Sequence, residues 1–250
     1  MTRGRSLALG LLALLAIAGG GGPARGDGVV ADLSSHLIAI TSGFTGASVV
    51  LFGATEGRGD IVAVVRGPER EVTVWRKGKV AGIWVNAESV TFSNVPSFYA
   101  VATSRPLDEV VAPGPSALYR IGTANLKLQA KPPATSDEAT RFGAALVAEQ
   151  QRDGLFASNT GKIAFLGERL FRATIDFPAN VPTGTYIVEV FLVRDRDVVS
   201  GQTTPLVVSK VGLDAAVSDF ATRQAAAYGA IAVVTALVAG WLASLPFRSV

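Results

Sequence analysis

The sequence contains no cysteine, and its 250 residues include only one histidine and one methionine, which is the initiator. Without cysteine the chain has no disulfide framework, no thiolate metal site and no thiol redox chemistry. A copper or zinc site would also lack the imidazole and thioether ligands that such metals favour. We therefore expect no metal and no cofactor.

An excess of positive charge is also missing from the middle of the chain. Residues 27–223 hold 19 Lys and Arg against 20 Asp and Glu, so the net charge of +3 comes from the two ends. Proteins that bind nucleic acid usually carry basic charge on their folded part. We therefore predict no nucleic-acid partner.

Charge is absent from two long apolar runs, and the first lies near the N-terminus. Arg3 and Arg5 precede the apolar run 7–18, which is followed by glycines and small residues. This order is typical of a secretory signal peptide. It predicts a signal peptide over 1–26 with cleavage after Ala24 or Gly26, and a retained N-terminal anchor is the alternative.

The second apolar run covers 224–247 and contains no charged side chain. A helix of that length reaches roughly 36 Å, enough to cross a hydrocarbon core of about 30 Å. The run predicts one C-terminal transmembrane helix, preceded by a juxtamembrane segment at 213–223 and followed by a cytoplasmic tail at 248–250. A buried helix of the folded part and a cleaved signal for a glycolipid anchor are the alternatives.

Small residues recur along this predicted helix in steps of four, three, four and four. Such steps place them on one helical face, where they allow another helix to approach closely. Chance placement in an alanine-rich segment is the alternative. The candidate packing face consists of Ala225, Gly229, Ala232, Ala236 and Gly240.

The segment 27–105 has the pattern of short strands separated by turns. Apolar runs recur at 36–41, 47–52 and 60–65, and Gly or Gly-Pro ends each of them. The run 60–65 has no polar alternation, which is typical of a strand covered on both faces. We predict a small antiparallel β-sandwich with about seven strands.

Proline and glycine at 106–116 predict a linker to a second unit, 117–212. Thr135 and Glu138 have the spacing of a capping box and predict a helix over about 136–152. The alternation at 171–177 and the longer run 186–193 predict strands. The predicted fold is therefore mainly β: two tandem Ig-like β-sandwich units, the second with an inserted helix, plus the transmembrane helix.

Close spacing along the chain disfavours a catalytic role for Asp32, Ser34, Ser35 and His36. Residues so near one another do not easily aim at each other as a triad does, and no nucleophile elbow is present. We expect Asp32 and Ser34 to bond local backbone at a strand entry. The sequence predicts no enzyme.

Among the aromatic residues of the first predicted unit, four are candidates for an interaction site: Trp75, Trp84, Phe98 and Tyr99. Most aromatics of a small sandwich belong to its core, and we expect two or three of these four to be buried. Any exposed remainder forms a candidate interaction patch for docking or for stacking on sugars.

Several segments carry a family resemblance: 31–46, 80–86, 95–107 and 177–186. Together they resemble a family of transmembrane proteins of alphaproteobacteria, over nearly the whole chain. The resemblance implies a Gram-negative envelope, so that the exported part lies in the periplasm, and it implies an association with permeases of the sulfite-exporter type. These motifs carry no known chemistry, so no catalytic residue is transferred.

The functional expectation combines these elements. We expect a membrane-anchored periplasmic binding or accessory protein in the inner membrane, single-pass, acting with a membrane-protein partner such as a transporter or permease. The alternative is a periplasmic ectodomain that binds or senses a small molecule or an envelope polymer.

Overall fold

The computed structural model describes residues 28–80, 82–212 and 221–244. The predicted signal peptide and most of the predicted juxtamembrane segment lie outside these ranges. The strands are β1 Val29–Leu33, β2 Leu37–Ile40, β3 Ala47–Thr55, β4 Asp60–Arg66, β5 Glu69–Val80, β6 Ile83–Pro96, β7 Tyr99–Thr103, β8 Gly161–Lys162, β9 Ala164–Leu166, β10 Leu170–Phe177, β11 Gly184–Arg194 and β12 Asp197–Lys210. The helices are α2 Leu107–Val110, α3 Pro113–Leu118, the 3₁₀ helix η1 Thr123–Asn125, α4 Ser136–Arg152 and α6 Ala225–Ser244.

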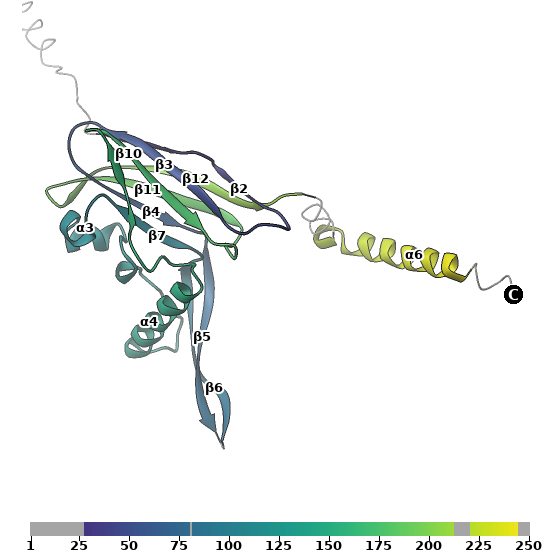
Figure 1. Ribbon diagram of the computed structural model, residues 1–250. Helices are drawn as coiled ribbons and strands as arrows, with labels where there is room; N and C mark the ends of the chain where they lie inside the picture. Colours follow the sequence, from purple (N-terminus) through teal and green to yellow (C-terminus); the bar gives the residue numbers. More distant parts are fainter. Residues whose placement is uncertain (1–27, 81, 213–220, 245–250) are drawn as a thin grey trace, which may run out of the picture.

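Two sheets stack face to face as a β-sandwich (Figure 1). The four-stranded sheet has the order β1-β3-β10-β9, and the six-stranded sheet has the order β2-β12-β11-β4-β7-β8. Most neighbours are antiparallel, whereas β2 pairs with β12 and β8 with β7 in parallel. The long strands β11 and β12 form the hairpin that turns at Asp195 and Arg196, both with positive φ.

The main core lies between the two sheets. Along β10 every second residue is buried, from Phe171 to Phe177, which confirms the alternation predicted for this segment. Phe177 stacks on Phe98 at a centroid distance of 4.9 Å, and Tyr186 packs against both rings. Burial of this apolar layer is the main favourable term for the fold.

A second core covers the part of the outer face of the six-stranded sheet that β4, β7 and the end of β11 form. There β4 contributes Val62 and Val64, while its alternate residues face the first core. The covering elements are α2, the chain at Ile121, Leu126 and Leu128, α4 and the base of the β5–β6 hairpin. Burial on both faces explains the unbroken apolar run of β4 and confirms that prediction.

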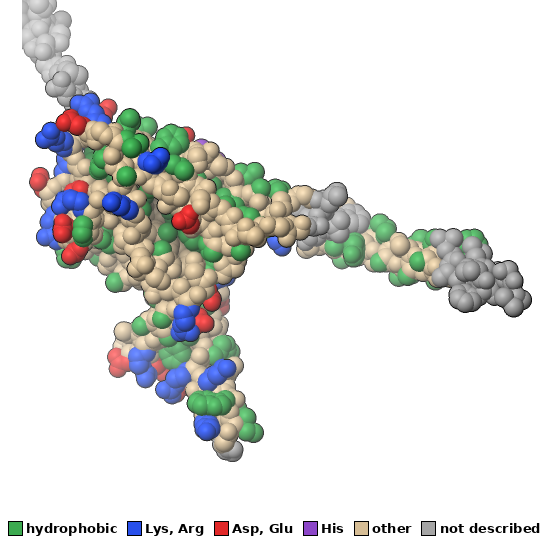
Figure 2. Space-filling model, in the orientation of Figure 1, with side chains coloured by type: hydrophobic (Ala, Val, Ile, Leu, Met, Phe, Trp, Pro, Cys, Tyr) green, Lys and Arg blue, Asp and Glu red, His purple; other side chains and the backbone are tan. Residues whose placement is uncertain are grey.

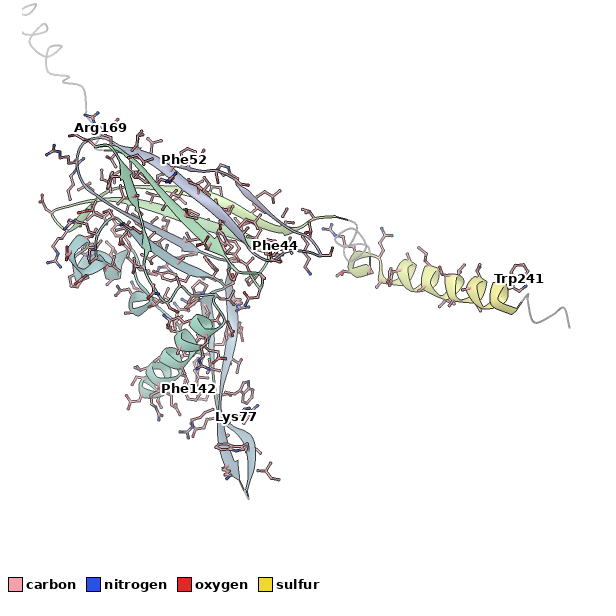
Figure 3. The ribbon with its side chains drawn as sticks, in the orientation of Figure 1. Phe44, Phe52, Lys77, Phe142, Arg169 and Trp241 are labelled. Atoms are coloured by element: carbon pink, nitrogen blue, oxygen red, sulfur yellow. The ribbon has the colours of Figure 1, made fainter. Side chains whose placement is uncertain are left out.

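Helix α4 buttresses the hairpin base. Thr135 and Glu138 form the predicted capping box, and the helix spans 136–152 as expected. Phe142 and Leu146, one turn apart, are buried in the second core with Phe92 of β6 (Figure 3). Beyond this support the hairpin projects away from the sandwich (Figure 1).

The prediction of two tandem Ig-like units is wrong. Strands from both halves of the sequence share both sheets, because β10 pairs with β3 and β11 pairs with β4. The boundary expected between 27–105 and 117–212 therefore runs through one sandwich, and the predicted linker at 106–116 contains α2 and part of α3.

The predicted transmembrane helix is also overturned. In the described parts of the chain we find no helix with the length and apolar character needed to cross a membrane. The described helix in this region is α6, and residues 245–247 of the predicted span lie outside the described residues.

Candidate functional site

Three surface features stand out on the described structure: a projecting hairpin, an uncovered face of the four-stranded sheet, and a polar pocket at the hairpin base. The hairpin is β5–β6, and its distal part carries Trp75, Ile83, Trp84 and Val85 on its surface. Trp75 is 55% exposed and Trp84 is 65% exposed. Exposed aromatic side chains in a cluster are uncommon outside interaction sites.

The four candidate aromatic residues divide into two buried and two exposed side chains, which agrees with the expectation that two or three of them are buried. Phe98 and Tyr99 are buried on opposite faces of the six-stranded sheet, Phe98 in the first core and Tyr99 in the second. Only Trp75 and Trp84 remain at the surface, so the four aromatics do not form one patch. The difference arises because α4 and the sheets cover the hairpin base but not its distal part.

The strand register places cations beside the two tryptophans. Alternation along β5 puts Trp75, Lys77 and Lys79 on one face, and Lys79 lies opposite Trp84. The ammonium of Lys79 lies 5.8 Å from the centroid of the Trp84 ring, within cation–π range. On the other face Arg76 forms an ion pair with Glu88. Figure 2 shows hydrophobic and basic side chains together over this hairpin.

The outer face of the four-stranded sheet is the second feature. One row of outward-facing residues crosses all four strands, because Ala54 lies opposite both Val30 and Leu170, and Leu170 lies opposite Leu166. Val30 is 66% exposed and Leu170 is 56% exposed. Phe52 belongs to the next row and is labelled on the outer side of the sandwich in Figure 3.

These side chains enclose a shallow apolar groove of about 390 Å³. Ala54 forms its low centre, and the larger side chains of Val30, Phe52, Leu166 and Leu170 form its walls. Asp32 and Arg172 lie opposite Phe52 on the neighbouring strands and give the groove a charged border. We call this surface the sheet-face groove.

Sequence reasoning missed this groove, although a signal for it exists. The run 49–52 in β3 contains four apolar residues without a polar alternate. Inward-facing Val49 and Leu51 account for only half of the run. The other half had to point outward, which a strict test of the two-residue period would have shown.

A polar pocket of about 290 Å³ lies where the hairpin base meets the six-stranded sheet. Arg66 and Glu189 form an ion pair there, and Arg120 lies 3.7 Å from Glu69. The Nη2 of Arg66 also donates to the carbonyl oxygen of Tyr119 at 2.6 Å, while its buried Nε has no acceptor among the described residues. Burial lowers the pKa of Arg66 from its usual value.

Two hydrogen bonds of the Tyr99 hydroxyl stabilise the backbone at Arg120, which lines this pocket. The hydroxyl donates to the carbonyl oxygen of Arg120 at 2.9 Å and accepts from the backbone N–H of Gly122 at 2.8 Å. Arg120 has a φ of 54°, a conformation that costs energy for a residue with a side chain. Burial raises the pKa of the Tyr99 hydroxyl to about 12.

The residues first considered for catalysis form a small surface network. The Nε2 of His36 lies 2.8 Å from Asp32 Oδ1, and both side chains are about half exposed. Ser34 Oγ accepts from the Val50 backbone N–H, and Ser35 Oγ donates to the Leu37 carbonyl oxygen. Asp32 accepts from the N–H of Leu33, which confirms the predicted local backbone bond of Asp32. For Ser34 the prediction is wrong, because its backbone partner Val50 is 16 residues away on β3.

No cluster of His, Asp and Glu suited to a metal ion is present among the residues that the structure describes. The candidate packing residues Ala225, Gly229, Ala232, Ala236 and Gly240 all lie in α6 and are exposed. A Cβ placed at Gly229 or Gly240 meets no atom within 4 Å. The described structure therefore shows no packing on that face.

Residues 28–249 match the family described as "Putative transmembrane protein (Alph_Pro_TM)". The chain belongs to this family. The resemblance found in the sequence motifs is thereby confirmed, and the family description suggests a membrane protein. Searches of curated proteins and of solved structures found no match.

Proposed function

We propose that this chain is a periplasmic binding or accessory protein that acts at the inner membrane with another membrane protein, such as a transporter. The family description and the signal-like N-terminus support a place in the envelope. The observation that carries the binding role is the sheet-face groove.

The groove has the composition of the centre of a protein–protein interface. Its lining is almost entirely apolar, and charged side chains stand only at its border. Interfaces commonly combine an apolar centre with a polar rim. Alanine between larger side chains gives a concave surface, so a protruding apolar side chain of a partner protein fits it better than a flat surface would.

The groove also lies on a sheet face that no helix or hairpin of the described residues covers. On the other sheet the second core, which includes Phe142 and Leu146, covers the outer face over β4, β7 and the end of β11, while Leu37 of β2 and Val207 of β12 stay exposed. Leaving Val30, Leu170 and Phe52 in water forfeits the stabilisation that their burial would provide. A partner that covers the groove recovers it.

Site-specific photo-crosslinking tests this proposal in the native membrane. A photoreactive phenylalanine analogue replaces Phe52 in the full chain, and a control places it at Thr174, which is exposed on the polar part of the same sheet. We expect an integral inner-membrane protein to be crosslinked from position 52 and not from position 174. In addition, Leu170→Glu should abolish that crosslink and the co-purification of the same protein, because it buries a charge in the groove.

Two outcomes contradict the proposal. One is the same crosslinking pattern from positions 52 and 174, which means non-specific capture. The other is a crosslink and co-purification that survive Leu170→Glu while circular dichroism shows that the variant is folded.

A second candidate function is the binding of a small anion in the polar pocket, which agrees with a ligand-binding or sensing role. The buried Nε of Arg66 has no acceptor in the described parts of the chain, which favours this role, as do Arg120 and Lys127 in the lining. Inorganic phosphate and simple carboxylates should then raise the melting temperature, and Arg120→Gln should remove the effect. An unchanged melting temperature with every anion contradicts this role.

A further inference from the structure

We propose that the distal part of the β5–β6 hairpin binds the surface of a bilayer that contains anionic phospholipid. The proposal concerns residues 75–79 and 82–88, which we call the hairpin tip. It does not depend on the sheet-face groove, because the two surfaces lie on different elements and have different chemistry.

The hairpin tip lacks the supporting core that holds the hairpin base. The base is held by Val90, Phe92 and Val95, which are buried in the second core. No such core lies under the tip, where Ile83, Trp84 and Trp75 are all more than half exposed. A two-stranded ribbon alone is marginally stable in water, and apolar side chains on its surface gain nothing there.

The exposed side chains of the tip are of the types that favour a membrane surface. Tryptophan is enriched at the boundary between lipid and water, where the ring contacts acyl chains and the indole N–H remains hydrated. Lysine complements it, because the methylene stem lies along apolar surface while the ammonium reaches the headgroups. Trp75, Trp84, Lys77 and Lys79 share one face of the tip.

The hairpin tip also carries positive charge. Arg76 is paired with Glu88, whereas no carboxylate of the described residues forms an ion pair with Lys77 or Lys79. These two lysines present positive charge on a chain whose middle part is otherwise nearly neutral. Each lysine near an anionic membrane surface raises the affinity about fivefold at physiological ionic strength.

The position of the hairpin makes its tip accessible to a flat surface. The hairpin projects from the sandwich, so its end can reach a flat surface before the bulky body does (Figure 1). Lys77 is labelled on this projection in Figure 3. A planar bilayer fits a protruding ribbon with apolar residues on both faces, since Ile83 and Val85 lie opposite the tryptophan face and can enter the same interfacial layer.

Tryptophan fluorescence of the full chain tests the proposal. The sequence has three tryptophans, so Trp241→Phe leaves only Trp75 and Trp84 to report on the tip. With vesicles of equal parts phosphatidylglycerol and phosphatidylcholine, we expect a blue shift of the emission, protection from acrylamide and quenching by lipids brominated near the headgroup. Because these readouts are local, they register the tip whatever the rest of the chain contacts.

Charge variants distinguish binding to anionic lipid from non-specific adsorption to vesicles. Lys77→Gln with Lys79→Gln should raise the concentration of anionic vesicles needed for the half-maximal shift by about 25-fold, the product of two fivefold effects. The matched control is Lys162→Gln with Arg169→Gln, an equal change of charge at exposed positions of the sandwich. This control should leave the half-maximal concentration unchanged.

Three results overturn the proposal. The first is emission that stays water-exposed and fully open to acrylamide with anionic vesicles. The second is a response that neither the tip variant nor replacement by pure phosphatidylcholine vesicles reduces. The third is a blue shift that appears only when a co-purifying protein is added, which assigns the tip to a protein partner.

Discussion

At the scale of single residues, Gly53 and Phe171 show how closely neighbouring strands of the four-stranded sheet are fitted. They lie opposite each other on β3 and β10. A Cβ at position 53 would lie 2.5 Å from the Phe171 ring and 2.4 Å from the carbonyl oxygen of Val30. The ring thus fills the space that a side chain at position 53 would occupy, so glycine is required there for packing.

We predict that Gly53→Ala lowers the free energy of unfolding by roughly 1–3 kcal/mol, because ring and backbone must both move. Urea unfolding measures the change. Gly143→Ala is the control: in α4 an added Cβ makes only ordinary contacts, the nearest at 3.7 Å. It should leave stability unchanged or raise it, because alanine favours helix. Equal losses in both variants would contradict the assigned packing.

The Tyr99 hydroxyl is a second residue with a measurable consequence. Its pKa rises from 10.0 to about 12 because the ring is buried. Below pH 10 the hydroxyl is protonated in both the folded and the unfolded state, and its ionisation does not affect stability. Between pH 10 and about 12 the unfolded chain releases the proton while the folded chain retains it, so stability is lost as pH rises.

We predict that wild type loses about 2–3 kcal/mol of unfolding free energy through Tyr99 across this interval. Tyr186 adds a similar loss, since burial raises its pKa to about 12 as well. Tyr99→Phe should be less stable at pH 8, having lost two hydrogen bonds, but should show a shallower decline above pH 10. Urea midpoints at several pH values decide this, and identical slopes for variant and wild type would refute it.

At the scale of elements, α4 determines how far the hairpin is supported. The capping box at Thr135 starts the helix, and its apolar face then meets the hairpin base through Phe142 and Leu146. Leu146 is 1% exposed. The helix therefore acts as a buttress: it fixes the base and leaves the hairpin tip free to contact another surface.

We predict that Leu146→Ala costs about 2–5 kcal/mol of unfolding free energy, from lost burial and the cavity left behind. Hydrogen exchange should also accelerate in β5 and β6 near Phe92, because the buttress is loosened. Arg141→Ala, on the exposed side of the same helix, is the control and should change little. Exchange in the hairpin that is unaffected by Leu146→Ala would mean that α4 does not support it.

At the scale of the whole molecule, the interleaving of the two sequence halves is the dominant fact. Strand β3 lies between β1 and β10, and β4 lies between β11 and β7. Each half thus supplies strands to both sheets. Neither half contains a complete set of hydrogen-bonding neighbours or a complete core.

We predict that the sandwich unfolds in a single cooperative transition, with circular dichroism and hydrogen exchange of both halves changing together. A fragment of residues 117–212 should remain unfolded, because β10 and β11 then lack β3 and β4. Two separate transitions, or a dispersed NMR spectrum from that fragment, would show that the halves fold independently.

The sequence by itself determined the local elements. The capping box and helical spacing located the helix at 136–152, the two-residue period located β10, and the unbroken apolar run of β4 indicated burial on both faces. Each of these signals is written within a few residues, because caps, periods and turns depend on neighbours in the chain. The family resemblance was likewise carried by short motifs.

Only the tertiary structure decided which strands pair and which aromatic residues are covered. The pairing of β3 with β10 joins residues more than a hundred positions apart, and no local period encodes that choice. Trp84 and Tyr99 have similar apolar character in the sequence, yet one is exposed and the other buried. The difference depends on whether other elements of the fold, such as a sheet or α4, cover the side chain. Only the folded chain establishes this.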